Sequence, residues 1–101
     1  MPAATPSSAL YGSQRTATTL QATVTASAAK IAASATPFEH IVFQNNGANP
    51  MWIGDSTITT SKGIKLAAGG VPVYIPGLRG DLSLLYVIGT LNDKLDILYF
   101  Q

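Results

Sequence analysis

The sequence predicts an all-β domain, an antiparallel β-sandwich of jelly-roll-like form over residues 20–101, preceded by an extended N-terminal arm over residues 1–19. Three observations predict it. Runs of β-branched and aromatic residues, many alternating polar with apolar, are separated by turn signals about every eight to twelve residues. No segment has a convincing helical period. Apart from Met1, the first 19 residues contain only Leu10 and Tyr11 as large apolar side chains.

The arm is too poor in apolar groups to order itself. Fixing its backbone costs roughly 20–35 kcal/mol at about 1–2 kcal/mol per residue, whereas its two large side chains return about 1.5–3 kcal/mol each on burial. We therefore expect the arm to take its order from a neighbouring chain. Leu10, Tyr11 and Arg15 are the expected anchors, and the chain is expected to be a subunit of an assembly.

The first half of the domain predicts four strands. Residues 21–25 alternate polar with β-branched side chains, and the alanine-rich residues 28–33 are expected to form a short edge strand. Residues 40–44 are a β-rich run that ends at the Asn-Asn-Gly turn of residues 45–50. Asn-Gly tolerates positive φ, so residues 51–53 are expected to return as the partner strand of a hairpin.

The second half predicts the remaining strands. A polar connection over residues 56–63, with Ile58 turned inward, leads to a short strand at 64–66. Residues 71–75 are expected to form a strand that lies at a sheet edge or whose Pro72 faces away from a neighbour, because Pro72 cannot donate to a ladder. Residues 82–88 are apolar on both faces and are expected to form a central strand, and residues 95–100 form the last one. Alternation predicts the following core: Ile41, Phe43, Ile53, Val73, Ile75, Leu84, Tyr86, Ile88, Ile97 and Tyr99.

The low charge content and the small net charge limit the kinds of partner that the chain is expected to bind. Charged residues make up 11% of the chain and the net charge is +1, against a usual charged fraction near a quarter. A covered subunit surface explains this, and so does a small β-domain that carries hydroxyl groups outside. No two basic residues are adjacent, so nucleic acid is not an expected partner. The chain has no cysteine, no secretory leader and no apolar stretch long enough to span a membrane, so no membrane association is expected.

Catalytic and metal-binding patterns are absent from the sequence. His40 stands beside Glu39 without a second histidine or a Gly-x-Ser-x-Gly turn, so we expect a polar residue at a strand end. Most acidic residues lie beside turns, where carboxylates usually bond backbone N–H groups. A glycosidase pair stays open, because two carboxylates need only meet in space. Residues 60–63 lack the order of a phosphate-binding loop. We expect no cofactor, no metal and no enzymatic activity.

Trp52 is the candidate for a ligand contact. An aromatic ring beside a turn can stack on a sugar, with Asn45 and Asn46 supplying polar contacts. The alternative is that Trp52, out of phase with its neighbours, packs under the arm or against another subunit.

Residues 41–54, 59–70 and 85–89 resemble small virion proteins of tailed bacteriophages, most closely capsid decoration (cement) proteins. The resembling stretches are IVFQNNGANPMWIG, TTSKGIKLAAGG and LYVIG, which are turn and strand residues. The resemblance implies a β-sandwich, often trimeric, on the exterior of a capsid, where it clamps neighbouring copies of the major capsid protein. Similar modules in phage tails and fibres supply the alternative, a tail, fibre or glycan-binding β-module. A hydrolase is a distant third expectation.

Overall fold

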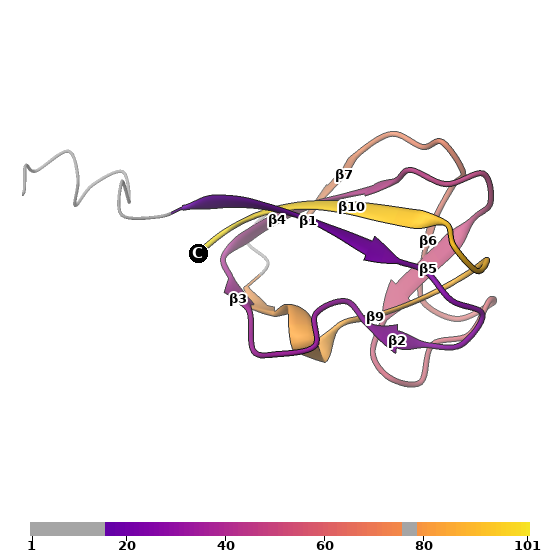
Figure 1. The fold of residues 1–101 in the computed structure, drawn as a ribbon, viewed down its shortest axis with the longest axis horizontal. Coiled ribbons are helices and arrows are strands. Elements are labelled where there is room, and N and C mark those ends of the chain that lie inside the picture. Colours follow the sequence, from indigo (N-terminus) through magenta and orange to yellow (C-terminus); the bar gives the residue numbers. More distant parts are fainter. Residues whose placement is uncertain (1–15, 76–78) are drawn as a thin grey trace, which may run out of the picture.

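The computed structural model describes residues 16–75 and 79–101, which form an antiparallel, sandwich-like β-domain (Figure 1). One four-stranded sheet has the order β1-β10-β4-β7, and a second has the order β2-β9-β5-β6. The first sheet comprises β1 (Ala17–Thr23), β10 (Lys94–Phe100), β4 (His40–Asn45) and β7 (Val73–Ile75). The second comprises β2 (Ala29–Lys30), β9 (Tyr86–Ile88), β5 (Met51–Gly54) and β6 (Ile64–Leu66). The all-β prediction is confirmed.

A third, two-stranded sheet lies at one end of the domain. It pairs β3 (Pro37–Phe38) with β8 (Gly80–Asp81) and is followed by η1, a 3₁₀ turn over Leu82–Leu84. Asp81 caps this turn by accepting a hydrogen bond from the Ser83 amide. Phe38 and Leu82 are buried, so this small sheet closes one end of the core.

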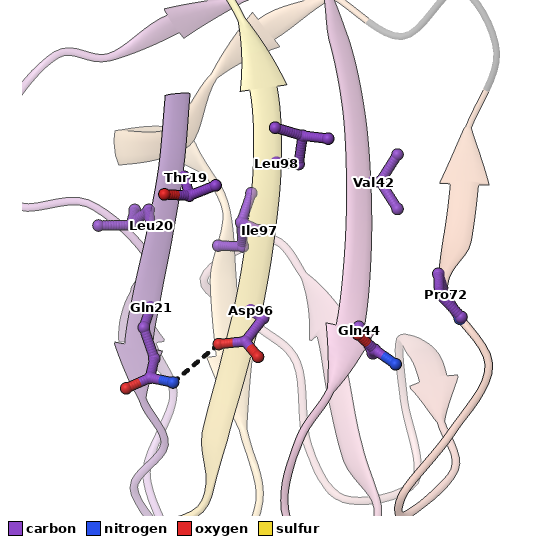
Figure 2. Close-up of a pocket in the computed structure, with 9 residues that line it drawn as sticks. All are labelled: Thr19, Leu20, Gln21, Val42, Gln44, Pro72, Asp96, Ile97 and Leu98. Carbon is purple, nitrogen blue, oxygen red and sulfur yellow. Dashed lines mark hydrogen bonds between the residues drawn. The ribbon is translucent and has the colours of Figure 1, made fainter. Parts of the chain in front are cut away.

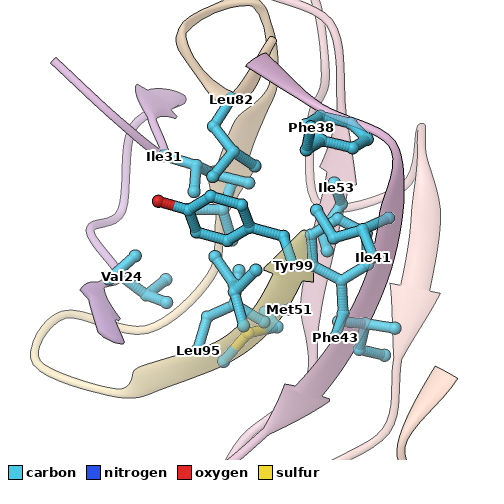
Figure 3. Packing of buried hydrophobic residues seen from close by; sticks show 14 residues of the cluster. Val24, Ile31, Phe38, Ile41, Phe43, Met51, Ile53, Leu82, Leu95 and Tyr99 are labelled. Carbon is cyan, nitrogen blue, oxygen red and sulfur yellow. The ribbon is translucent and has the colours of Figure 1, made fainter. Parts of the chain in front are cut away.

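The core lies between the two four-stranded sheets and draws from both (Figure 3). The alternation along β4 and β10 places one face of each strand inside, as the sequence predicts. The buried cluster is Ala22, Val24, Ile31, Phe38, Ile41, Phe43, Met51, Ile53, Leu66, Leu82, Val87, Leu95, Ile97 and Tyr99. Val73 and Ile75 are half-buried and pack against it.

The hairpin predicted at residues 45–50 is wrong. β4 pairs with β10 and β7, whereas β5 pairs with β6 and β9 in the other sheet. Both edges of β4 are thus occupied, so the connection has to cross the core to the opposite sheet. Gly47 does not have the positive φ of an Asn-Gly hairpin turn. It is required instead by close packing, since a Cβ there would lie 2.6 Å from Cγ of Asp93.

The single strand predicted over residues 82–88 is also wrong in its first half. Residues 82–84 form η1, and only Tyr86–Ile88 form a strand, β9, which is central in its sheet as predicted. The Asp81 cap starts a 3₁₀ turn, so the inward and outward alternation predicted for a strand does not hold over residues 82–84. Leu82 and Val87 are consequently buried, whereas Leu84 is 69% exposed and Tyr86 is half-buried, contrary to the core prediction.

The edge strands follow the prediction in two cases. β2 and β7 both lie at sheet edges, as expected from the alanine-rich segment and from Pro72. β1 begins at Ala17, so residues 17–19, which the sequence assigned to the arm, pair with β10. The alternation of polar and apolar residues is weak there, because the inward-facing position 18 holds a threonine and not a large apolar residue.

Candidate functional site

The predicted arm anchors Leu10, Tyr11 and Arg15 lie outside the described residues. The described chain starts at Thr16, whose carbonyl accepts a hydrogen bond of 3.1 Å from the Gln101 amide. The arm therefore precedes the first residue of β1, and this start of the strand lies beside Gln101. Its role stays a prediction.

Asn45 is a buried structural residue. Its side chain is 2% exposed. The Nδ2 group donates to the carbonyl oxygens of Asn49 at 2.8 Å and Leu66 at 3.0 Å, and Oδ1 accepts from the Gly47 amide at 2.8 Å. Both Nδ2 hydrogens and the side-chain oxygen of Asn45 are therefore engaged by backbone groups at the crossing between the sheets and in β6. The side chain therefore holds that crossing and does not face a surface ligand.

Asn46, in contrast, is exposed. Its Nδ2 group donates to Oδ2 of Asp96 on β10 at 3.1 Å. Asp96 also accepts from Nε2 of Gln21 at 2.8 Å through its other oxygen. These three side chains form a polar cluster on the outer face of the β1-β10-β4-β7 sheet.

Trp52 lies on the outer face of the other sheet and is half-buried. It stands opposite Lys65 of β6, whose Nζ atom is 5.9 Å from the centre of the indole ring, a cation–π contact. The loop that follows β5 folds back, and the buried Ile58 contacts the site of Gly54 where a Cβ would be. Ile58 is thus buried, as predicted, but it packs against the outer face of the sheet and is not part of the core cluster between the sheets. Trp52 is partly packed by its own chain.

A groove of about 440 Å³ marks the outer face of the β1-β10-β4-β7 sheet (Figure 2). Three of its lining residues lie in one row across the strands, because Thr19 is paired with Leu98 and Leu98 with Val42. Tyr74 is paired with Val42 and continues the row, although it does not line the groove. Leu98 is 39% exposed and Tyr74 is 53% exposed. We call this row, Thr19, Leu98, Val42 and Tyr74, the outer apolar row.

The ends of the groove differ in chemistry. The polar cluster of Gln21, Asp96 and Asn46 borders one end, with Gln44 nearby donating to the Gly70 carbonyl at 3.3 Å. Beyond the other end, Phe100 is 36% exposed and makes an edge-to-face contact with His40, with ring centres 6.5 Å apart. His40 is therefore a strand-end residue packed on an aromatic ring. The groove lining is more apolar than polar, and Asp96 is its single carboxylate.

Two acidic side chains, Asp55 and Asp81, accept hydrogen bonds within turns. Oδ1 of Asp81 accepts from the amides of Thr36 and Ser83, both at 2.8 Å, and from the Ser83 hydroxyl at 2.7 Å. These bonds, the Thr36 amide foremost, lower the pKa of Asp81. Thr57 likewise lowers the pKa of Asp55 through its hydroxyl and its amide. Groups held ionised in this way stabilise turns and are poor general acids.

Within residues 16–75 and 79–101, no three His, Cys, Asp or Glu side chains gather in a way that could hold a metal ion. In the same ranges no helix is long and apolar enough to cross a membrane. Comparisons with protein-family models, with curated proteins and with solved structures find no match to this chain.

Sequence reasoning did not single out the outer apolar row. One signal was present, since Leu98 and Phe100 occupy the outward phase of residues 95–100, where a solvent-facing strand normally carries polar groups. The alignment of Leu98 with Val42 and Tyr74 depends on strand order and register, which no local pattern encodes.

Proposed function

We propose that this chain is a non-enzymatic structural protein of a bacteriophage virion. It decorates the capsid exterior and stabilises the shell by bridging neighbouring copies of the major capsid protein. The observation that carries the proposal is the outer apolar row. A sheet face that presents Leu98, Val42 and Tyr74 side by side, in a chain with few charges, is suited to being covered by another protein.

The strand order favours the same proposal. The chain passes to the opposite sheet between most consecutive strands, and the orders β1-β10-β4-β7 and β2-β9-β5-β6 are all antiparallel. We infer from this connectivity that the eight strands are arranged as a jelly roll. Jelly rolls are frequent in viral capsid domains and in lectins. The fold thus supports a virion protein and its main alternative.

The proposed mechanism is binding linkage. A protein that binds only the assembled lattice stabilises that lattice by its free energy of binding. The sheet face provides a rigid contact, and the arm orders on the neighbouring subunit. Burying about 1,000 Å² of arm and lattice surface at about 25 cal/mol per Å² returns about 25 kcal/mol, which is comparable with the cost of ordering the arm.

Co-sedimentation with empty capsids purified from the encoding phage tests this proposal. Deletion of residues 2–15 leaves the described domain whole, and Leu98→Lys places a charge on the row. Each is expected to weaken capsid binding about tenfold or more, because burying an apolar side chain contributes about 1.5–3 kcal/mol. Leu91→Lys is the matched control, since Leu91 is 61% exposed in a turn away from the row. Unchanged binding of both test variants would refute the proposal.

A tail, fibre or glycan-binding β-module is the second candidate, and the outer face of the β2-β9-β5-β6 sheet favours it. Tyr86 of β9 pairs with Gly54, and Trp52 of β5 pairs with Ile88, so both aromatic rings project from the same face. Lys65 adds a cation beside Trp52. A glycan array separates the candidates: a binding module gives sugar signals that Trp52→Ala abolishes, whereas a decoration protein gives none.

A further inference from the structure

β1 is an unusually accessible edge strand. All seven of its residues, Ala17 to Thr23, pair with β10 in continuous register, and it is the terminal strand of its sheet (Figure 1). Its other side faces no strand in the described chain. A long edge strand of this kind is a template for pairing with another strand.

The other edge strands carry protective features that β1 lacks. β7 has three residues and follows Pro72, β6 has three residues and includes Lys65, and β2 has two residues and includes Lys30. Short length, proline and lysine are the common ways in which proteins prevent edge-to-edge association. β1 (ATTLQAT) has no charge, no proline, no glycine and no bulge. Within residues 16–75 and 79–101, β1 is thus the one edge strand of the two larger sheets without such a feature.

The ladder with β10 fixes which backbone groups of β1 are free. The Thr16 carbonyl accepts from Gln101, and the Val24 amide donates to Asp93 at 2.8 Å. Because hydrogen-bonding direction alternates along an antiparallel strand, even-numbered residues face β10. The amides and carbonyls of the odd-numbered residues, 17, 19, 21 and 23, therefore face outward.

We propose that β1 pairs with β1 of a second copy of this chain, antiparallel about a two-fold axis at Leu20. In this register residue 17 meets residue 23 and residue 19 meets residue 21, so every outward backbone group finds a partner. The half-buried Leu20 meets its counterpart as a non-hydrogen-bonded pair, in which side chains are closest.

The self-complementarity of β1 is what selects a second copy as the occupant. Small or hydroxyl side chains meet at the ends, Thr19 meets Gln21, and no like charges oppose one another. The two sheets join into one eight-stranded sheet, and the outer apolar row of each copy lies on the same side. The proposed pair has two-fold symmetry, whereas the resemblance implies a trimer.

Sedimentation equilibrium of the purified chain over a wide concentration range tests this inference without a capsid, so its failure is separate from failure of the proposed function. The wild type is expected to shift from one to two chain masses as concentration rises. Thr19→Pro removes an outward N–H without breaking the ladder to β10, and it should remain monomeric. Thr19→Val is the matched control, because it keeps the N–H and the β-branched shape, and it should dimerise like the wild type.

A second variant covers the chance that proline disturbs the strand. Thr19→Lys with Gln21→Lys places lysines directly opposite each other in the proposed register, so it should be monomeric with an unaltered thermal melt. A wild type that stays monomeric at all concentrations, or that forms trimers, would overturn the inference. So would dimers of the double lysine variant as tight as those of the wild type.

Discussion

Replacement of Asn45 by alanine is expected to destabilise the domain more than any other single change at a polar residue. The side chain makes three hydrogen bonds, to Asn49, Leu66 and Gly47, and is 2% exposed. A hydrogen bond contributes about 1 kcal/mol net, and stranded buried partners add to the loss. The expected decrease in the free energy of unfolding is about 3 kcal/mol. Since about 1 kcal/mol shifts the melting temperature of a small domain by about 4–8 °C, the melt should fall by roughly 12–24 °C.

Urea denaturation is the suitable assay for Asn45→Ala, because Trp52 is the only tryptophan in the chain and reports on the adjoining strand. Asn46→Ala is the matched control. It removes the same side chain one residue later, where the single hydrogen bond to Asp96 is exposed, and it should cost less than about 0.5 kcal/mol. Equal losses for the two variants would refute the assignment of Asn45 to the crossing between the sheets.

Three further predictions follow from the turns and from the small sheet. Gly47→Ala should lower the free energy of unfolding by about 1–3 kcal/mol, because its Cβ would overlap the Asp93 side chain; a neutral effect in urea denaturation would contradict this. By the same assay, Leu82→Ala should lower the free energy of unfolding by about 2–5 kcal/mol, whereas Leu84→Ala should change it little. A larger loss for Leu84→Ala than for Leu82→Ala would favour the strand that the sequence predicts over residues 82–88. The lowered pKa of Asp81 means that its stabilising effect is present above the carboxyl pKa of the unfolded chain and is lost as pH falls through the folded value. A series of melts at acid pH should therefore be flatter for Asp81→Asn than for the wild type, and parallel curves would show that Asp81 contributes nothing.

The sequence predicted the strands whose side chains alternate strictly and missed features that depend on long-range arrangement. Ile41, Phe43, Ile97 and Tyr99 were predicted in the inward phase of their strands, and all four are buried. The Asn-Gly turn gave the wrong pairing, because a local turn signal does not reveal that β10 and β7 already occupy both edges of β4.

The error at residues 82–88 had a local signal that was overlooked. Asp81-Leu82-Ser83 is a capping sequence, since a carboxylate two residues before an amide can bond it and begin a helical turn. Hydrophobicity at Leu84 and Leu85 outweighed that signal in the strand prediction. For the candidate site, Trp52 was correctly predicted out of phase with its buried neighbours. The outer apolar row needed the cross-strand register of β10, β4 and β7.

The number of copies bound per capsid is the measurement that tests the central proposal most directly. Capsids saturated with the purified chain, freed of unbound protein and quantified against the major capsid protein, give this ratio. Decoration of a lattice predicts saturation at a fixed, simple ratio to the major capsid protein. A few copies per particle, as expected of a tail or fibre component, or binding that never saturates would contradict the proposal.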